Sequence, residues 1–338
     1  MKWLALDIGG ANLKAADIGQ FAVVQPFPLW QKPRQLVESL RALIAVGHGA
    51  DHLAVTMTGE LADCFVTKAD GVRAIVEAVS HAADGRHTRI YLTDGRLVTS
   101  QVALTNPVLA AASNWHALAR FAGRYAKHAQ ALLVDIGTTT TDIIPLSEGE
   151  PQTTARTDPE RMANGQLLYT GVERTPLCAL LANTSWRGQA VPVAHEVFST
   201  MWDVYLTLGQ LPEMPTSTHT ADHRPASRAC ALDRLARSIC ADRTMFSAED
   251  AMAMASAAAD AQASLIQKAL EKVIAQMSGA PQKVIICGRG EFLARSVLEK
   301  LKLDCEIVSL NQKLGPELSE CATAHALAVL ATEAMSES

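Results

Sequence analysis

One pattern occurs twice in this sequence and limits the folds that the chain can adopt. A short apolar run ends in Asp-Ile-Gly, small polar residues follow, and an apolar segment returns, first in residues 3–18 and again in residues 131–146. Such an order is typical of a strand, a tight turn and an antiparallel return strand. Its recurrence indicates two similar lobes of the kind that gene duplication leaves.

Strand and helix patterns alternate along both halves, which predicts an α/β fold. In the first half we expect, in order, return strands at 14–17 and 22–25, a helix at 34–45, a strand at 52–57, a helix at 71–82, a strand at 89–92 and a long helix at 107–126. In the second half we expect helices at 228–242 and 247–277 and a strand at 283–287.

These patterns divide the chain into an N-terminal lobe of residues 1–130 and a C-terminal lobe of residues 131–338. Segment 150–225 is rich in Thr, Pro and Gly, so we expect it to form an insertion that carries a substrate loop. A glycine-rich loop is expected at 287–291.

Composition restricts the function classes. The formal net charge is −5 and no long basic run occurs, which disfavours nucleic acid as a partner. Seven scattered cysteines without a Cys-x-x-Cys pair indicate reduced thiols and a cytoplasmic location. The alanine-rich stretch 251–266 contains Asp260 and Gln262 and is shorter than the ~20 residues that a membrane span needs. We therefore expect a packed helix there and no membrane partner.

The first turn, Asp7-Ile-Gly9-Gly10-Ala-Asn12-Leu-Lys14, has the composition of a phosphate-binding loop. Two glycines let backbone N–H groups approach phosphate oxygens closely, and the lysine adds positive charge. The carboxylate suits Mg²⁺ or its water shell. An ordinary β-turn explains the same letters equally well.

The second turn is less ordinary. Asp135-Ile-Gly137 is followed by Thr138, Thr139, Thr140 and Thr141 and then by Asp142, so hydroxyls and amides crowd a single turn. Such a surface suits anions, and a solvated hairpin tip is the alternative.

A third glycine turn, Gly288-Arg289-Gly290, follows the apolar run at 284–287 and precedes a helix pattern. It lets the backbone run close to an anionic or flat ligand, although a structural turn is as good an interpretation. The third glycine of a dinucleotide fingerprint is missing, which disfavours a Rossmann dehydrogenase.

Taken in order, the three turns resemble those of the actin-like ATPase superfamily of sugar kinases, heat-shock ATPases and actin. That resemblance implies two duplicated actin-like (ribonuclease H-like) lobes with a ligand cleft between them. Residues 153–176, together with 134–142, are similar to the hydantoinase/oxoprolinase-like branch that is linked to tetrahydromethanopterin-dependent one-carbon metabolism.

This branch implies a transferase of methanofuran or methylofuran biosynthesis. The expected reaction joins a furanylmethyl diphosphate to the phenol of γ-glutamyltyramine, or a related acceptor, and releases diphosphate. The implied cofactor is Mg²⁺ at Asp7 and Asp135, and ATP binding is left open but is not required for this reaction. Partners would be small molecules, with a homodimer left open. An ATP-dependent small-molecule kinase and a nucleotide-binding regulator without turnover remain alternatives.

Several side chains are candidates for the chemistry. Asp7, Asp135 and Asp142 are the catalytic candidates, and Asp142, Glu60 and Asp203 are each able to accept the phenol proton. Substrate contacts are expected from the fork-shaped guanidinium groups of Arg161 and Arg174, from the ring of Tyr169 and from Glu60. For each of them a solvated or packing role is the alternative.

Other chemistry-bearing residues are better explained as structural. His219 and His223 have a spacing that a zinc ion tolerates, but no cysteine pair accompanies them. Cys240 is expected to be a buried helix residue, and His116 and His195 to be hydrogen-bonded or surface histidines.

Overall fold

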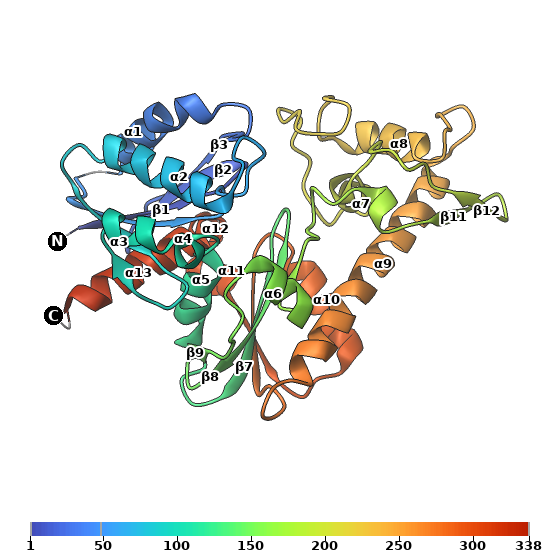
Figure 1. The fold of residues 1–338 in the computed structure, drawn as a ribbon. Coiled ribbons are helices and arrows are strands. Elements are labelled where there is room, and N and C mark those ends of the chain that lie inside the picture. The colour runs from blue at the N-terminus through green and yellow to red at the C-terminus, as the bar shows by residue number, and fades with distance from the viewer. Residues whose placement is uncertain (1, 48, 337–338) are drawn as a thin grey trace.

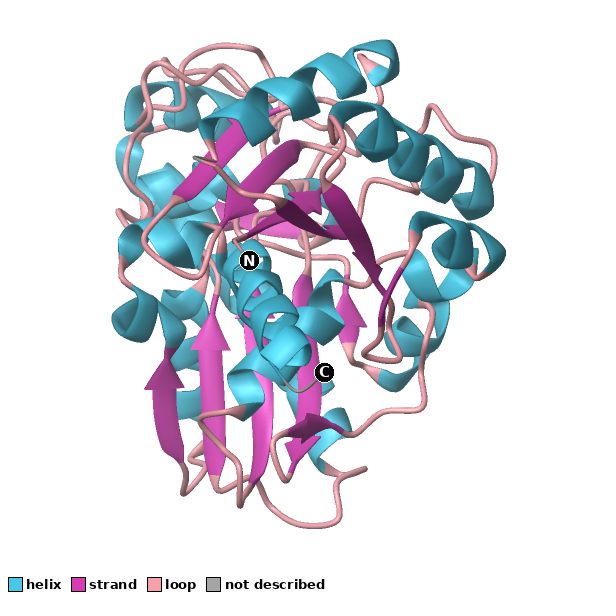
Figure 2. Ribbon diagram, turned by 90° about the vertical axis from the view of Figure 1, so that its left-hand side faces the viewer, coloured by secondary structure: helices cyan, strands magenta, loops and turns pink. Residues whose placement is uncertain are grey.

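The computed structural model describes residues 2–47 and 49–336, which form two lobes, each built on a mixed sheet (Figure 1; Figure 2). The first sheet has the order β3-β2-β1-β4-β5-β6. Its strands are β1 (Trp3–Ile8), β2 (Asn12–Ala16), β3 (Ala22–Pro26), β4 (His52–Met57), β5 (His87–Tyr91) and β6 (Leu97–Val98).

The second sheet has the order β10-β8-β7-β13-β14, and β9 also pairs with β8. Its strands are β7 (Gln130–Ile136), β8 (Thr141–Ser147), β9 (Glu150–Pro151), β10 (Leu167–Leu168), β13 (Lys283–Cys287) and β14 (Glu306–Ser309). In both sheets an antiparallel hairpin is followed by two parallel neighbours, β1-β4-β5 and β7-β13-β14. The shared topology confirms the duplicated α/β lobes.

Helices cover both sheets (Figure 2). In chain order they are η1 (Pro33–Gln35), α1 (Leu36–Val46), α2 (Lys68–Ala82), α3 (Ser100–Thr105), α4 (Pro107–Ala110), α5 (Asn114–Gly123), α6 (Asp158–Asn164), η2 (Leu177–Ala179), α7 (Met201–Thr207), α8 (Arg228–Arg237), α9 (Ala248–Ile274), α10 (Glu291–Leu301), α11 (Leu310–Leu314), α12 (Pro316–Glu320) and α13 (Ala322–Ser336).

The lobes exchange helices, which the expected division at residue 130 does not capture. Helix α5 precedes β7, yet Leu118 on its buried face packs in one core with Leu133 and Ile144 of the second sheet. The C-terminal helix α13 returns to the first lobe, where Leu327 packs with Trp3 of β1. Each lobe therefore has a core that is completed by a helix from the other half of the sequence.

The expected long helix at 107–126 is wrong. The chain forms α4 and α5 instead, and residues 111–113 between them are not helical. Ala112 has φ +46°, outside the helical region. The buried Ser113 Oγ lies 2.8 Å from Thr56 Oγ1 of β4, a contact that a continuous helix would have to give up.

The segment after β10 forms an inserted part with the separate hairpin β11 (Asn183–Trp186) and β12 (Gln189–Pro192) and the helices α7 and α8 (Figure 1, upper right). The alanine-rich helix α9 connects this part to the second lobe, and its Ala251, Ala255 and Ala258 are buried in a hydrophobic cluster formed by residues of both. Within the described residues, no helix has the length and apolarity that crossing a membrane requires.

Candidate functional site

The first loop closes at the ends of β1 and β2. Asp7 pairs in register with Lys14, and Gly9 N donates to Asn12 O at 3.0 Å. A Cβ on Gly9 would lie 2.9 Å from that same Asn12 oxygen, so this turn needs glycine. Gly10 is different, because a Cβ there would meet no described atom within 4 Å. Its backbone therefore borders open space.

The second loop repeats this construction. Asp135 pairs in register with Asp142, and Gly137 N donates to Thr140 O at 2.9 Å. Thr138, Thr139 and Thr140 are half-buried. The register partner of the loop aspartate is thus a lysine in one lobe and a second aspartate in the other, so the two halves of the site differ in charge.

The loop carboxylates lie in one electrostatic environment although they belong to different lobes. Burial raises the pKa of Asp7, and Lys14 acts against it. Asp135 is half-buried as a residue, but its carboxyl is shielded from water, and this burial together with the Asp142 charge raises its pKa to about 6. A hydrogen bond from the Cys287 thiol and the charge of Lys14 lower the same pKa, while the Asp7 charge raises it. Charges of the first loop therefore reach the second.

The third glycine turn lies directly on the second loop. Gly288 has φ +85°, and a Cβ there would stand 2.4 Å from Asp135 Oδ1. Gly290 N donates to Ile136 O at 2.8 Å. Both glycines are therefore required for close packing against the end of β7, which is the structural interpretation of this motif.

Arg289, between these glycines, is already engaged. Its Nε lies 2.5 Å from Glu173 Oε1, and its Nη2 donates to Met214 Sδ at 3.4 Å. Glu173 itself is anchored to the second loop, because its N–H donates to Thr138 O at 3.1 Å. The sequence predicts that Arg289 contacts phosphate. In the structure its guanidinium is paired with Glu173, in the segment that holds the second loop, called here the threonine loop (Gly137–Thr141).

Segment 170–175 packs against the threonine loop. Thr141 Oγ1 donates to Thr170 O at 2.8 Å, and a Cβ on Gly171 would come within 2.5 Å of Thr138. Gln262 of α9 donates to Thr170 Oγ1 at 2.8 Å. This buried polar network fixes the loop against α9.

The expected substrate role of Arg161 is wrong. Its side chain is 2% exposed, and its Nη2 pairs with Asp142 Oδ1. Its guanidinium also stacks on Trp115 of α5, 4.2 Å from the ring centroid. Burial raises the pKa of Asp142 and Arg161 lowers it, so the two side chains form a compensated buried pair. Asp142 is consequently a poor candidate for a free proton acceptor.

Glu60 lies at the start of a chain of charges between the lobes. Lys68 Nζ on α2 is 3.6 Å from Glu60 Oε1 and 2.5 Å from Asp158 Oδ2 on α6. Arg161 Nη1 is 3.7 Å from Asp158 Oδ1, which links this chain to Asp142. Glu60 is 1% exposed, and its Oε2 has no hydrogen-bond partner in the described part of the molecule. Burial raises its pKa, while Lys68 opposes the shift.

Two expected contact residues are accessible. The guanidinium of Arg174 lies 5.5 Å from the ring centroid of Trp30 in the other lobe, and Arg174 has no ion pair among the described residues. Tyr169 is 69% exposed, as a ligand-stacking ring would have to be before binding. Trp30 and Lys68 are not among the expected site residues, because nothing local to them indicates which loop they approach. Cys287 is expected only as the start of the glycine-rich loop, and its hydrogen bond to Asp135 comes from the packing of β13 beside β7.

The remaining candidates are placed as follows. Asp203 pairs with Arg234 at 2.7 Å inside the inserted part, so it is not a free base. Cys240 is exposed and has φ +57°, which corrects the expectation of a buried helix residue. Buried His116 Nδ1 lies 2.9 Å from Tyr91 OH, as expected for a structural histidine. No group of three or more His, Cys, Asp or Glu side chains suited to a metal is found among the described residues, and His219 and His223 gain no third ligand.

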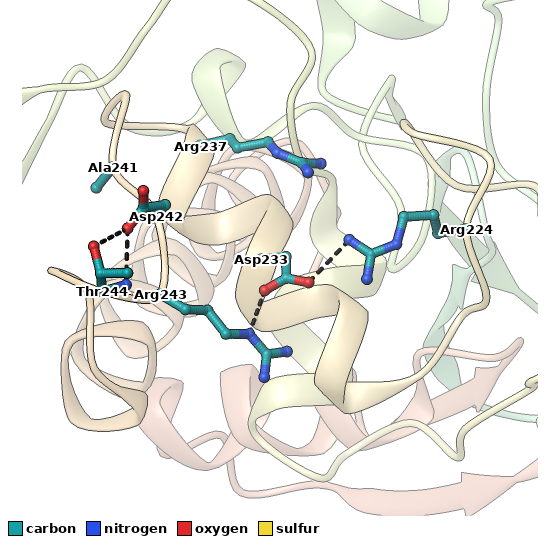
Figure 3. A pocket seen from close by; sticks show the side chains of 7 residues that line it. All are labelled: Arg224, Asp233, Arg237, Ala241, Asp242, Arg243 and Thr244. Carbon is teal, nitrogen blue, oxygen red and sulfur yellow. Dashed lines mark hydrogen bonds and ion pairs between the residues drawn. The ribbon is translucent and has the colours of Figure 1, made fainter.

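Two cavities in the described structure are lined by other residues than the three loops. The larger, of about 510 Å³, is bordered by Arg224, Asp233, Arg237, Ala241, Asp242, Arg243 and Thr244 (Figure 3). Arg224 and Arg243 both point to Asp233, and Arg237 pairs with Asp222 at 3.0 Å. The charged side chains at this cavity are therefore paired with one another or with Asp222 next to it. The smaller, of about 230 Å³, includes His116 and Arg120.

Comparison with known proteins gives consistent results. The hydantoinase/oxoprolinase family profile matches residues 51–334. The (4-{4-[2-(γ-L-glutamylamino)ethyl]phenoxymethyl}furan-2-yl)methanamine synthase of Methanocaldococcus jannaschii is 32% identical over 332 residues, 97% of this chain and 96% of the relative. The synthase of the same name from Methanococcus vannielii is 31% identical over 201 residues, 59% of this chain and 89% of that relative.

Among solved structures, the polyphosphate/ATP-glucomannokinase of Arthrobacter sp. strain KM aligns over 98% of this chain and 99% of its own. Its sequence identity is 14% and its TM-score 0.46.

Proposed function

This chain belongs to the hydantoinase/oxoprolinase family, and from that premise we propose that it is a transferase that forms an aryl ether with diphosphate as the leaving group. The donor is a furanylmethyl diphosphate and the acceptor is the phenol of γ-glutamyltyramine or a related compound, in methanofuran or methylofuran biosynthesis for tetrahydromethanopterin-linked one-carbon metabolism. The observation that carries the proposal is the 32% identity to the archaeal synthase over 97% of the chain.

The chemistry separates charge, and the loops suit that task. As the bond between the methylene carbon and the diphosphate oxygen breaks, negative charge grows on the diphosphate and the furan oxygen shares the positive charge left on carbon. Backbone N–H groups at Gly10 and the threonine loop, with Lys14, offer donors and a cation where that negative charge develops. The phenol oxygen then forms the new bond to the methylene carbon and loses its proton.

Asp7 and Asp135 fit a Mg²⁺ ion. Asp7 Oδ1 is buried and has no hydrogen-bond partner within the described residues, which is costly unless a cation or water completes it. Magnesium needs few protein ligands, because it retains waters and binds phosphate oxygens directly. When bound, Mg²⁺ neutralises charge on the diphosphate.

Glu60 is the proton acceptor that the contacts favour. Asp142 and Asp203 are each paired with an arginine, whereas Glu60 keeps a buried oxygen without a partner in the described structure. Burial raises the pKa of Glu60, and a more basic carboxylate accepts a proton more readily. Lys68 beside it can stabilise the charged form before the proton arrives.

The test is a reaction without nucleotide. The purified protein, Mg²⁺, a synthetic furanylmethyl diphosphate and γ-glutamyltyramine should give pyrophosphate and the coupled ether, detected by mass spectrometry, with no ATP present. Formation of ADP from ATP and an acceptor, with no ether, would establish the kinase alternative. Nucleotide binding without any product would establish a regulator instead.

The proposed enzyme acts on small molecules and works in the cytoplasm. Its seven cysteines, all within the described residues, are free, which supports a reducing compartment.

A further inference from the structure

Trp30 is positioned by the first phosphate loop. Its neighbour Leu29 donates from N–H to Gly10 O at 2.9 Å, and Phe27 donates to Ala11 O at 2.9 Å. These two bonds fix the turn that carries the indole against the loop whose glycine borders open space.

The core of the first lobe does not explain Trp30. Phe27 and Leu29 are buried in that core, 3% and 0% exposed, whereas half-buried Trp30 joins none of the hydrophobic clusters formed by the described residues. A tryptophan beside a ligand loop and outside the core has its ring available for recognition.

The guanidinium that lies over the indole belongs to Arg174, in the segment bonded to the second phosphate loop. Arg174 N donates to Thr138 O at 3.0 Å, which joins its backbone to the threonine loop. Its exposed guanidinium lies 5.5 Å from the Trp30 ring centroid. Trp30 and Arg174 are therefore one residue from each half of the site, and they meet between the two loops.

We propose that Trp30 is a specificity-determining residue that recognises the flat furan ring of the donor, and that Arg174 leaves the indole for the diphosphate when the donor binds. The cation–π contact of the exposed Arg174 guanidinium is weak. Hydrogen bonds from the same guanidinium to diphosphate would be charge-assisted, which makes them roughly twice as strong as neutral hydrogen bonds. The exchange frees an aromatic face next to the reacting methylene carbon. This inference rests on the proposed transferase activity.

The first experiment compares Trp30→Ala and Trp30→Phe with the wild-type enzyme. Loss of stacking should raise KM for the furanylmethyl diphosphate about tenfold in Trp30→Ala, and Trp30→Phe should restore most of the affinity. Inhibition by inorganic pyrophosphate, which has no ring, should be unchanged in both variants. An unchanged KM, or an equal loss of pyrophosphate affinity, would overturn the proposal.

A matched control is available in Trp186. It also carries an arginine over its ring, Arg187 at 4.4 Å, but it lies in the β11–β12 hairpin of the inserted part. Trp186→Ala should leave KM for the donor unchanged, and a rise equal to that of Trp30→Ala would overturn the assignment.

Tryptophan fluorescence separates this inference from the proposed activity. Titration with the furanylmethyl diphosphate should change the emission of the wild-type protein and of Trp186→Phe, but not of Trp30→Phe. A wild-type protein that forms no ether refutes the transferase function, whereas a fluorescence change that persists in Trp30→Phe refutes only the role of Trp30.

Discussion

Lys68 Nζ lies 2.5 Å from Asp158 Oδ2 and joins helix α2 of the first lobe to helix α6 of the second. The same ammonium is the nearest cation to Glu60, 3.6 Å from its Oε1. One lysine thus connects the lobes and compensates a buried carboxylate that we propose as the proton acceptor.

Replacing Lys68 with Met should lower the free energy of unfolding by about 2 kcal/mol, because Glu60 would stay buried without its cation. Adding Glu60→Gln should recover most of that loss, since the neutral amide no longer needs a cation. Urea unfolding measures both effects. Lys300→Met is the control: its 3.0 Å bond to Asp260 joins two exposed side chains, and its removal should cost less than ~0.5 kcal/mol. Equal losses in the two single variants would contradict this account.

Replacing Arg161 with Ala should destabilise the protein by about 3–5 kcal/mol, because Asp142 would be left as an uncompensated buried charge. Chemical denaturation measures the loss. The double variant Arg161→Ala with Asp142→Asn should be more stable than the single one. A stable Arg161→Ala protein whose only defect is a raised substrate KM would instead restore the substrate role.

Strands β4 and β13 match their expected bounds at 52–57 and 283–287, because local apolar periodicity determines them. The duplication was likewise visible in the two loops. The ion-pair partner of Arg161 cannot be predicted from the sequence. Asp142 lies 19 residues away, and nothing in the sequence distinguishes it from other acidic residues or from solvent as the partner of an arginine.

The same limit applies to the site as a whole. Trp30 and Arg174 meet through the packing of two lobes, so no local pattern links them. The break between α4 and α5 depends on Ser113 reaching Thr56, a contact from another element that overrides helical periodicity. Tertiary contacts of this kind decide which polar residues face a ligand and which are paired with other groups of the protein.

Asp7→Asn and Asp135→Asn should each reduce turnover at least ~100-fold without loss of folding. For Asp7 the thermal midpoint should stay the same or rise, because burial raises the pKa of this carboxyl and a neutral amide avoids that desolvation. Removing Mg²⁺ with EDTA should abolish wild-type turnover, and adding Mg²⁺ should restore it. Full activity in either variant would exclude that carboxylate from the metal site.

Gly288→Ala should lower the free energy of unfolding by about 3 kcal/mol and should also reduce turnover. The added methyl carbon would lie only 2.4 Å from Asp135 Oδ1, so the carboxyl would have to move. Gly209→Ala isolates the backbone contribution: Gly209 has φ +70°, and its Cβ would meet no described atom within 4 Å. That control should cost only about 1 kcal/mol and leave turnover unchanged. Equal stability losses would mean that the close approach to Asp135 is unimportant.

His116 should make the protein sensitive to mild acid. Burial, with the charges of Arg120 and Arg156, lowers the pKa of this imidazole to about 3. Between about pH 6.5 and pH 3 the unfolded chain therefore binds a proton that the folded chain does not, and stability falls as the pH falls. The contribution approaches ~1.4 kcal/mol per pH unit within that window.

Urea unfolding of the wild type and of His116→Gln at pH 7, 6, 5 and 4 measures this contribution as the difference between the two slopes of unfolding free energy against pH. The wild-type slope should be the steeper, because glutamine does not titrate. His128→Gln, which changes an exposed histidine, should keep the wild-type slope, since that side chain meets water in both states. Parallel slopes for the wild type and His116→Gln would show that the buried imidazole takes up its proton without unfolding.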